Sequence, residues 1–262
     1  MSLLKKPYVL FILLLIVLAL GGQHLSPNDP YQPHIDQRLL PPSSTFLFGT
    51  DELGRCMFSR LICSVRVSLG LAASILAICL LIGACIGMVA GYFGGLVDEI
   101  LMRVTDTIMA LPSFIVAMVL IGTMGAGIGN MIFVFALTGW TRYARLTRSL
   151  VLNVKNANHV VTARLTGLGS VYILRRYILP AIARPLLVLG TLGMGMMILM
   201  TSSLSFLGLG ITEPTPDWGA MMTNGTTYIR SAAHLAIFPG ILICLTVLSF
   251  NLLGEALKKD SA

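Results

Sequence analysis

Residues 107–141 read TIMALPSFIVAMVLIGTMGAGIGNMIFVFALTGWT, which is 35 consecutive residues without an Asp, Glu, Lys or Arg. One helix of that length would measure about 52 Å, far more than the roughly 30 Å hydrocarbon core of a bilayer. Its middle, from Gly122 to Asn130, concentrates glycine and ends in asparagine, which is typical of a turn. The stretch therefore predicts two membrane spans that fold back on each other.

Four further uncharged stretches have the length of a membrane span, namely residues 7–28, 67–97, 185–212 and 231–254. The whole chain is 56% hydrophobic and 11% charged, against about 25% charged residues in soluble domains. This composition excludes a soluble globular protein. We predict an all-α polytopic membrane protein with six spans, at residues 7–24, 67–91, 104–122, 129–149, 185–209 and 234–254.

The spans divide the chain into a first transmembrane segment, residues 1–24, a loop, residues 25–66, and a five-span core, residues 67–257. With both termini in the cytoplasm, 13 of the 18 Lys and Arg residues lie on the cytoplasmic side. That makes the 25–66 loop extracytoplasmic. The basic residues are distributed between spans, which excludes a nucleic-acid-binding face. A cleaved signal peptide is the alternative interpretation of the first segment, because Lys5 and Lys6 precede an apolar core.

The sequence predicts no catalytic site, no metal site and no cofactor in this chain. The five cysteines have no Cys-x-x-Cys spacing and resemble buried small hydrophobic residues. No HExxH, GxSxG or phosphate-binding P-loop motif occurs, so the chain cannot bind a nucleotide through such a loop. Asp106 is interpreted as one half of a surface pair with Arg103. The methionines of residues 194–200 are interpreted as packing residues, with a soft-metal site as the alternative.

The cytoplasmic segment between spans four and five, residues 142–184, has eight basic residues and no acidic one. Within it Val161, Leu165, Leu168 and Tyr172 recur at the spacing of one face of a short helix, which Gly167 and Gly169 interrupt. Such a helix can rest on anionic lipid headgroups or dock on a protein. The pattern alone does not separate the two.

The same segment resembles the EAA loop of ATP-binding-cassette importer permeases. The residues that carry the resemblance are Val161-Thr-Ala-Arg-Leu-Thr-Gly167, followed after nine residues by Tyr177-Ile-Leu-Pro180. Ala163, Gly167, Leu179 and Pro180 agree with the motif. The chain departs from it at three positions, with Val161 in place of glutamate, Thr162 in place of the first alanine and Tyr177 in place of isoleucine.

Two other stretches are similar to the second permease subunit of dipeptide, oligopeptide and nickel importers. One is Gly49-Thr-Asp-Glu-Leu-Gly-Arg55 with Ser59-Arg60 and Arg66-Val-Ser-Leu69. The other is Leu204-Ser-Phe-Leu-Gly-Leu-Gly210 with Pro214, Pro216 and Trp218-Gly219. Cys56 stands where that family usually has aspartate. The resemblance covers residues 45–257, with a mild lean toward the nickel-type subunit.

The resemblance implies a type I importer permease in a bacterial or archaeal cell membrane, without catalysis of its own. Its implied partners are a homologous permease, two cytoplasmic ATPase subunits, an extracytoplasmic substrate-binding protein and membrane lipid. A coupling helix between spans four and five would contact the ATPase through Val161, Thr162, Ala163, Arg164, Leu165, Gly167, Leu168 and Gly169, and the loop would leave through Leu179 and Pro180.

The resemblance leaves the cargo open between peptides, nickel and a metal chelate. Trp218 is expected to be an interfacial anchor, with docking of the binding protein as the alternative. A different class, an ion-coupled secondary transporter, remains the alternative function. Such carriers usually have acidic residues inside the membrane, and here only Asp106 is placed near one.

Overall fold

The structure is a computed structural model that describes residues 6–259, so positions 1–5 of the predicted first segment lie outside the described residues. The described residues are mostly helical, and they contain no β-strand, only an isolated bridge between Thr50 and Cys56. The elements are α1 (Pro7–Leu25), η2 (Ile35–Gln37), α2 (Met57–Phe93), α3 (Gly95–Met109), α4 (Ser113–Met124), α5 (Ile128–Val154), α6 (Asn158–Leu165), α7 (Ser170–Ile173), η3 (Leu174–Ile178), α8 (Leu179–Phe206), α9 (Trp218–Thr227) and α10 (His234–Lys259).

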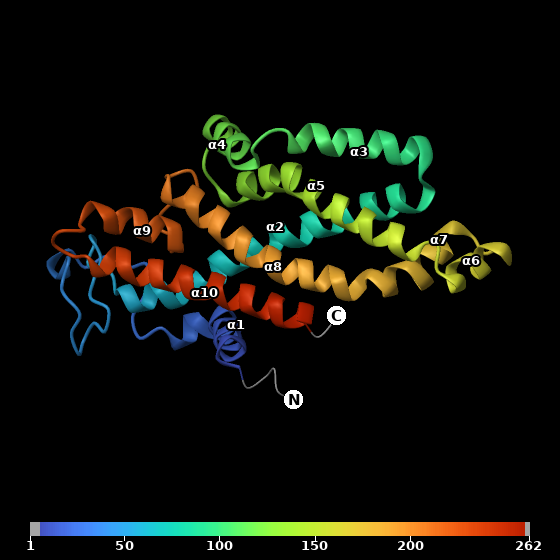
Figure 1. Cartoon of the computed structure of the whole chain (residues 1–262). Helices are drawn as coiled ribbons and strands as arrows, with labels where there is room; N and C mark the ends of the chain where they lie inside the picture. The colour runs from blue at the N-terminus through green and yellow to red at the C-terminus, as the bar shows by residue number, and fades with distance from the viewer. Residues whose placement is uncertain (1–5, 260–262) are drawn as a thin grey trace.

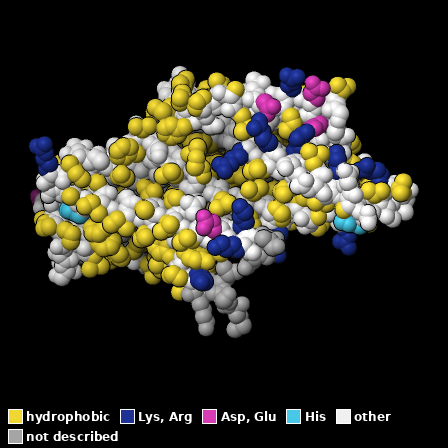
Figure 2. Space-filling view, viewed as in Figure 1, with side chains coloured by type: hydrophobic (Ala, Val, Ile, Leu, Met, Phe, Trp, Pro, Cys, Tyr) yellow, Lys and Arg dark blue, Asp and Glu magenta, His cyan; other side chains and the backbone are white. Residues whose placement is uncertain are grey.

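The long helices α2, α5, α8 and α10 run along the molecule and set its two ends (Figure 1). One end carries α9 and the irregular segment 26–56, and we call it the α9 end. The other carries α6 and α7, and we call it the α6 end. Figure 2 shows that on the face in view hydrophobic side chains cover the α9 half, whereas most Lys and Arg side chains gather toward the α6 end.

A line of small residues on α2 allows it to pack closely on α5, and this is the most extensive helix contact in the described chain. A Cβ atom at Gly83 would lie 2.6 Å from the carbonyl oxygen of Trp140, and one at Gly91 would lie 2.8 Å from the Cβ of Val151. Gly87, between them, faces the backbone of α5 in the same way. Small residues four apart are the usual means by which membrane helices bring their backbones together. The seam of Gly83, Gly87 and Gly91 therefore holds the last third of α2 against α5.

Four described helices are long and apolar enough to cross a membrane. They are α1, α2, the unbroken helix over Ser170–Phe206 and α10, and the bent pair α3 and α4 brings the number to as many as five. Helix α5 is 27 residues long but carries Arg142, Arg145 and Arg148 in its second half. The chain is thus a multi-pass membrane protein, and the number of six spans stays a prediction.

The third predicted span, residues 104–122, is wrong as a single helix. Helix α3 ends at Met109, α4 begins at Ser113, and the two axes differ by 72°. The cause is local, since a residue that precedes proline is pushed out of the helical region and Pro112 cannot donate a backbone hydrogen bond. The fold-back near residues 122–130 is confirmed, because α4 and α5 are separated only by residues 125–127, where Gly125 and Gly127 have positive φ angles.

Two predicted boundaries also differ from the structure. Helix α2 begins at Met57, so the last residues of the predicted 25–66 loop are helical. The predicted 142–184 loop is mostly helical as well, and within it only residues 155–157 and 166–169 are outside helices. Both helices continue beyond their apolar stretches because their polar residues have partners. Arg60 of α2 binds Glu213, and Arg148 of α5 binds Asp98.

Candidate functional site

Helix α6 is the centre of the predicted coupling segment, and it ends on a glycine cap. The backbone N–H of Leu168 donates to the carbonyl of Ala163 at 3.2 Å, and the N–H of Gly167 donates to that of Arg164 at 3.1 Å. This pair of bonds is the Schellman arrangement, which requires a residue with positive φ. Gly167 has a φ of 81°. The glycine of the motif therefore terminates α6, so the predicted interruption at Gly167 is confirmed, and Leu168 and Tyr172 lie beyond the end of α6.

One side of α6 is fixed to the rest of the bundle. Val160 and Ala163 are buried in a small apolar cluster with residues of α5, α7, η3 and α8. The guanidinium of Arg164 lies 5.2 Å from the centre of the Tyr92 ring, at the end of α2. A cation over an aromatic face adds about 0.5–1 kcal/mol at an exposed site. Helix α6 is therefore joined to the end of α2 and to the buried cluster that α5, α7, η3 and α8 share.

The other side of this segment exposes apolar side chains. The exposed fraction is 83% for Leu165, 69% for Val171 and 52% for Tyr172. Val161 and Leu168 are exposed in the same region. We call these five residues the docking surface, namely Val161, Leu165, Leu168, Val171 and Tyr172. Exposed apolar side chains of this kind are the ones that a protein partner or the lipid surface can cover.

The docking surface is connected to the bundle by one unbroken helix. Helix α7, the π-helical segment η3 and α8 join without a break from Ser170 to Phe206. Pro180 lacks an N–H for the carbonyl four residues earlier, which explains the wide turn at η3. Leu179 and Pro180, predicted to mark the exit of the loop, lie inside this helix, and so does Pro185. One continuous helix therefore joins the docking surface to the α9 end.

Ion pairs join α3 to the charged half of α5. Arg148 binds Asp98 through two hydrogen bonds, both 2.5 Å long, and Arg145 binds Asp106. Arg103 pairs instead with Glu99, at 3.5 Å. The predicted pairing of Asp106 with Arg103 is therefore wrong, because the antiparallel packing of α3 and α5 brings a closer guanidinium to Asp106.

At the α9 end, two of the motifs recognised in the sequence meet in a buried charge cluster. Asp51 accepts a hydrogen bond from the Nε of Arg55 at 2.6 Å, and its other oxygen accepts from two backbone N–H groups. Arg55 and Arg60 both bind Glu213, at 2.8 and 2.9 Å. The two arginine side chains are each only 2% exposed. The cluster fastens the start of α2 to the segment that connects α8 with α9.

Burial and the neighbouring arginines shift the pKa values of two carboxyl groups in this cluster in opposite directions. Burial raises the pKa of Glu52. Burial also acts to raise the pKa of Glu213, but the hydrogen bonds and charges of Arg55 and Arg60 outweigh it and bring that pKa below 4.5, the ordinary value. A lowered folded-state pKa stabilises the fold above the ordinary value, and that contribution is lost as the pH falls through the lowered one. The Glu213 pairs therefore persist at neutral pH.

A second connection joins the same elements. Asp217 caps α9 by accepting from the backbone N–H groups of Gly219 and Ala220, at 3.1 and 3.2 Å. Its other oxygen accepts from the Ser68 hydroxyl of α2 at 2.8 Å. The neighbouring Trp218 is 0% exposed and belongs to the core. The prediction of an interfacial anchor at Trp218 is wrong, because the cap at Asp217 turns the indole inward.

We expect that replacing Asp51 by asparagine will lower the free energy of unfolding by about 3 kcal/mol, because it leaves two buried guanidinium groups short of one counter-charge. Asparagine has the shape of aspartate and keeps one oxygen as a hydrogen-bond acceptor. The decrease in the free energy of unfolding therefore measures mainly the effect of the lost negative charge. Chemical unfolding of the purified protein in detergent measures it.

Asp36→Asn is the matched control, since Asp36 is exposed. Equal unfolding midpoints for the two variants would show that the cluster does not stabilise the fold.

Sequence reasoning missed Glu213 as the partner of the two arginines. A signal existed, because Glu213 and Asp217 are the only acidic residues between Asp106 and Glu255. An isolated pair of acids in an otherwise basic and apolar stretch indicates that each has a specific partner. Their partners lie about 150 positions away in the sequence, and no local pattern identifies them.

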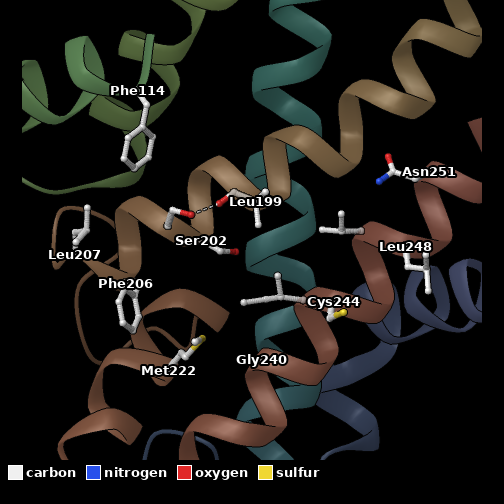
Figure 3. A pocket seen from close by; sticks show the side chains of 13 residues that line it. Phe114, Leu199, Ser202, Phe206, Leu207, Met222, Gly240, Cys244, Leu248 and Asn251 are labelled. Atoms are coloured by element: carbon white, nitrogen blue, oxygen red, sulfur yellow. Dashed lines mark hydrogen bonds between the residues drawn. The ribbon is translucent and has the colours of Figure 1, made fainter. Parts of the chain in front are cut away.

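A large cavity of about 730 Å³ opens between α8, α9 and α10. Figure 3 shows Leu199, Phe206 and Leu248 around it, with Phe114 of α4 at its edge. No charged side chain lines it, and the Ser203 hydroxyl donates back to the carbonyl of Leu199 at 2.7 Å. The cavity therefore offers an apolar surface, and a charged cargo would find no counter-charge there.

Comparison with known proteins places this architecture in a family. Residues 83–260 match the model described as "Binding-protein-dependent transport system inner membrane component". The chain is 40% identical to the nickel transport system permease protein NikC of Escherichia coli over 250 residues, which cover 95% of this chain and 90% of NikC.

Two further relatives have other named cargoes. The chain is 39% identical to the glutathione transport system permease protein GsiD of Pectobacterium atrosepticum, over 95% of this chain and 83% of GsiD. It is also 39% identical to the dipeptide transport system permease protein DppC of Bacillus subtilis, over 95% of this chain and 78% of DppC. The chain therefore belongs to the family of inner-membrane components of binding-protein-dependent transport systems, as a permease subunit of an ATP-binding-cassette importer.

Proposed function

We propose that this permease couples ATP hydrolysis to transport through the docking surface, which binds a cytoplasmic ATPase subunit. The observation that carries the proposal is the exposure of Leu165, at 83%, beside Val171 and Tyr172 on a segment without acidic residues. These apolar side chains gain free energy when a partner covers them. The basic residues around them, including Arg164, suit carboxylates at the edge of such a partner.

The mechanism follows from how α6 is anchored. When two ATPase subunits close on nucleotide, they displace α6, and the buried contacts of Val160 and Ala163 transmit the displacement to α2 and α5. The unbroken helix over Ser170–Phe206 transmits it along α8. The bundle then alternates between states open to either side of the membrane. In this mechanism the ATPase subunits hydrolyse ATP, and the permease converts their movement into a change of its own helix arrangement.

The proposal includes the composition and orientation of the transporter. This chain pairs with a homologous permease, and the path for cargo runs between the two, lined from this side by spans two to five. Both termini face the cytoplasm of a bacterial or archaeal cell, as the distribution of Lys and Arg favours. The α9 end, with the 25–66 loop, then faces an extracytoplasmic substrate-binding protein.

The cargo that we propose is a small peptide, nickel or a metal chelate. The names of the relatives support these classes, since the similar permeases serve nickel, glutathione and dipeptide transport systems. The similarity and the sequence motifs favour the nickel-type subunit mildly. Selection among cargoes rests largely with the separate binding protein.

Uptake by the reconstituted transporter tests the proposal. Vesicles that contain this permease with its partner subunits are loaded with ATP or with ADP, and uptake of nickel, glutathione and alanyl-alanine is measured in the presence of the binding protein. We expect uptake only with ATP, and we expect it to persist when ionophores collapse all ion gradients. Uptake that continues with ADP and stops with the ionophores would instead identify an ion-coupled secondary transporter.

A further inference from the structure

A smaller cavity lies where the third span is broken. It has a volume of about 190 Å³ and lies between the end of α3, the start of α4, the middle of α5 and α8. Methionines make up much of its wall, namely Met109, Met196, Met197 and Met200. Unlike the large cavity beside α10, this one has a charged side chain in its lining, that of Arg142.

Arg142 differs from the two arginines that follow it on the same helix. Arg145 and Arg148 each bind a carboxylate of α3. Arg142 is exposed and has no hydrogen bond or ion pair with any residue in the range 6–259. The reason is the break, because α3 ends at Met109 and residues 107–141 contain no acidic residue. The guanidinium therefore lines a cavity without the counter-charge that its neighbours have.

A second hydrogen-bond donor lines the same cavity. The hydroxyl of Ser113 has no hydrogen-bond partner among residues 6–259. The hydroxyls of Thr138 and Thr141 already donate to backbone carbonyls of α5, at 3.3 and 2.9 Å. A guanidinium without a counter-charge, a free hydroxyl and a methionine wall together suit an anionic oxygen group attached to a less polar body.

We propose that Arg142 and Ser113 form a subsite for a carboxylate of the cargo. This inference rests on the proposed function, and it adds the chemical group that the path recognises. A carboxylate can take two hydrogen bonds from a guanidinium in one plane, which a point charge cannot match. Ligand sites usually have volumes of about 300–1,000 Å³, so this cavity accepts one terminal group, while the rest of the cargo lies in the path outside it.

The subsite excludes a bare metal ion. Its only charged group is positive, and none of the residues that line it is His, Cys, Asp or Glu. Thioethers alone favour soft ions such as Cu(I) over nickel. Nickel that follows this route must therefore travel as a complex whose ligands supply carboxylates.

Chemical labelling tests the subsite without ATP. The five native cysteines are replaced by alanine, and Met109→Cys, in the wall of the same cavity but outside the proposed pair, serves as reporter in the assembled transporter. Its modification by an anionic and by a cationic methanethiosulfonate reagent is timed. We expect the ratio of anionic to cationic rates to fall about tenfold when Arg142 is replaced by glutamine. Arg103→Gln removes the same charge nearby and should leave the ratio unchanged. A ratio that does not depend on Arg142 would overturn the proposal.

Competition identifies the source of the carboxylate. Alanyl-alanine, which has a free carboxylate and no thiol that would consume the reagent, should slow the labelling, whereas alanyl-alanine amide should not. A phospholipid phosphate is the other source of anionic oxygen, so the labelling is repeated in vesicles with and without phosphatidylglycerol. Slowing by the anionic lipid, with no effect of alanyl-alanine, would assign Arg142 to lipid and overturn the inference. Because labelling needs no ATP, failure of ATP-driven uptake would count against the proposed function alone.

Discussion

Replacing Gly87 by leucine is expected to eliminate the folded permease from the membrane. A Cβ atom at this position would lie 2.7 Å from the Cβ of Thr147 and 2.9 Å from the backbone nitrogen of Arg148, and it would also collide with the carbonyl oxygen of Ala144. Two of these three neighbours are backbone atoms, which cannot rotate away. The helices α2 and α5 would have to separate at this point.

The separation would affect more than one position. Gly83 and Gly91 lie one turn to either side and depend on the same close approach. In a membrane, packing of this kind is what holds helices together, since lipid tails are as apolar as the helices. We therefore expect that full-length protein extracted in mild detergent will fall to background, as measured by size-exclusion chromatography of a fluorescent fusion.

Gly70→Leu is the matched control for this prediction. Gly70 lies on the same helix, but no atom lies within 4 Å of the Cβ that a side chain would add. We expect this variant to give a wild-type chromatogram. A monodisperse Gly87→Leu protein at normal yield would show that the glycine seam does not hold the fold.

Replacing Leu165 by glutamate is expected to stop uptake while the protein still folds. Leu165 is 83% exposed in this chain, so a carboxylate there meets water in the isolated permease. In the assembled transporter, the change removes about 1.5–3 kcal/mol of apolar burial and adds the cost of an unpaired buried charge. A total above about 3 kcal/mol corresponds to docking that is weaker by more than a hundredfold.

Two measurements separate docking from folding. We expect ATP-driven uptake by Leu165→Glu vesicles to fall below about a tenth of the wild-type rate, with an unchanged chromatogram of the permease alone. Leu165→Met keeps an apolar side chain of similar size and should retain uptake. Normal uptake by the glutamate variant would contradict a docking role for Leu165.

The sequence was informative wherever the structure depends on local composition. The uncharged stretches predicted the long helices, and the glycines of residues 122–130 predicted the fold-back. The motif around Ala163 and Gly167 predicted where the bundle would expose an apolar segment. In each case the signal is contained in a few neighbouring residues.

The sequence was uninformative wherever two distant segments meet. The partner of Arg55 and Arg60 is Glu213, more than 150 positions away, and only the packing of α2 on the segment before α9 brings them together. The sequence did not predict the packing role of Gly83, Gly87 and Gly91. A glycine in a helix can be recognised as a packing position only when the residues of α5 opposite it are known. The role of Gly167 as a helix cap also depended on hydrogen bonds that the sequence does not display.

The most direct test of the account is to ask what residue 165 contacts in the working transporter. A photoreactive benzoylphenylalanine is placed at position 165 of the permease in native membranes and irradiated, with the same residue at the exposed Leu47 of the α9 end as control. The account predicts a covalent adduct between position 165 and an ATPase subunit, and none from position 47. Adducts of position 165 with lipid alone, or with the substrate-binding protein, would contradict it.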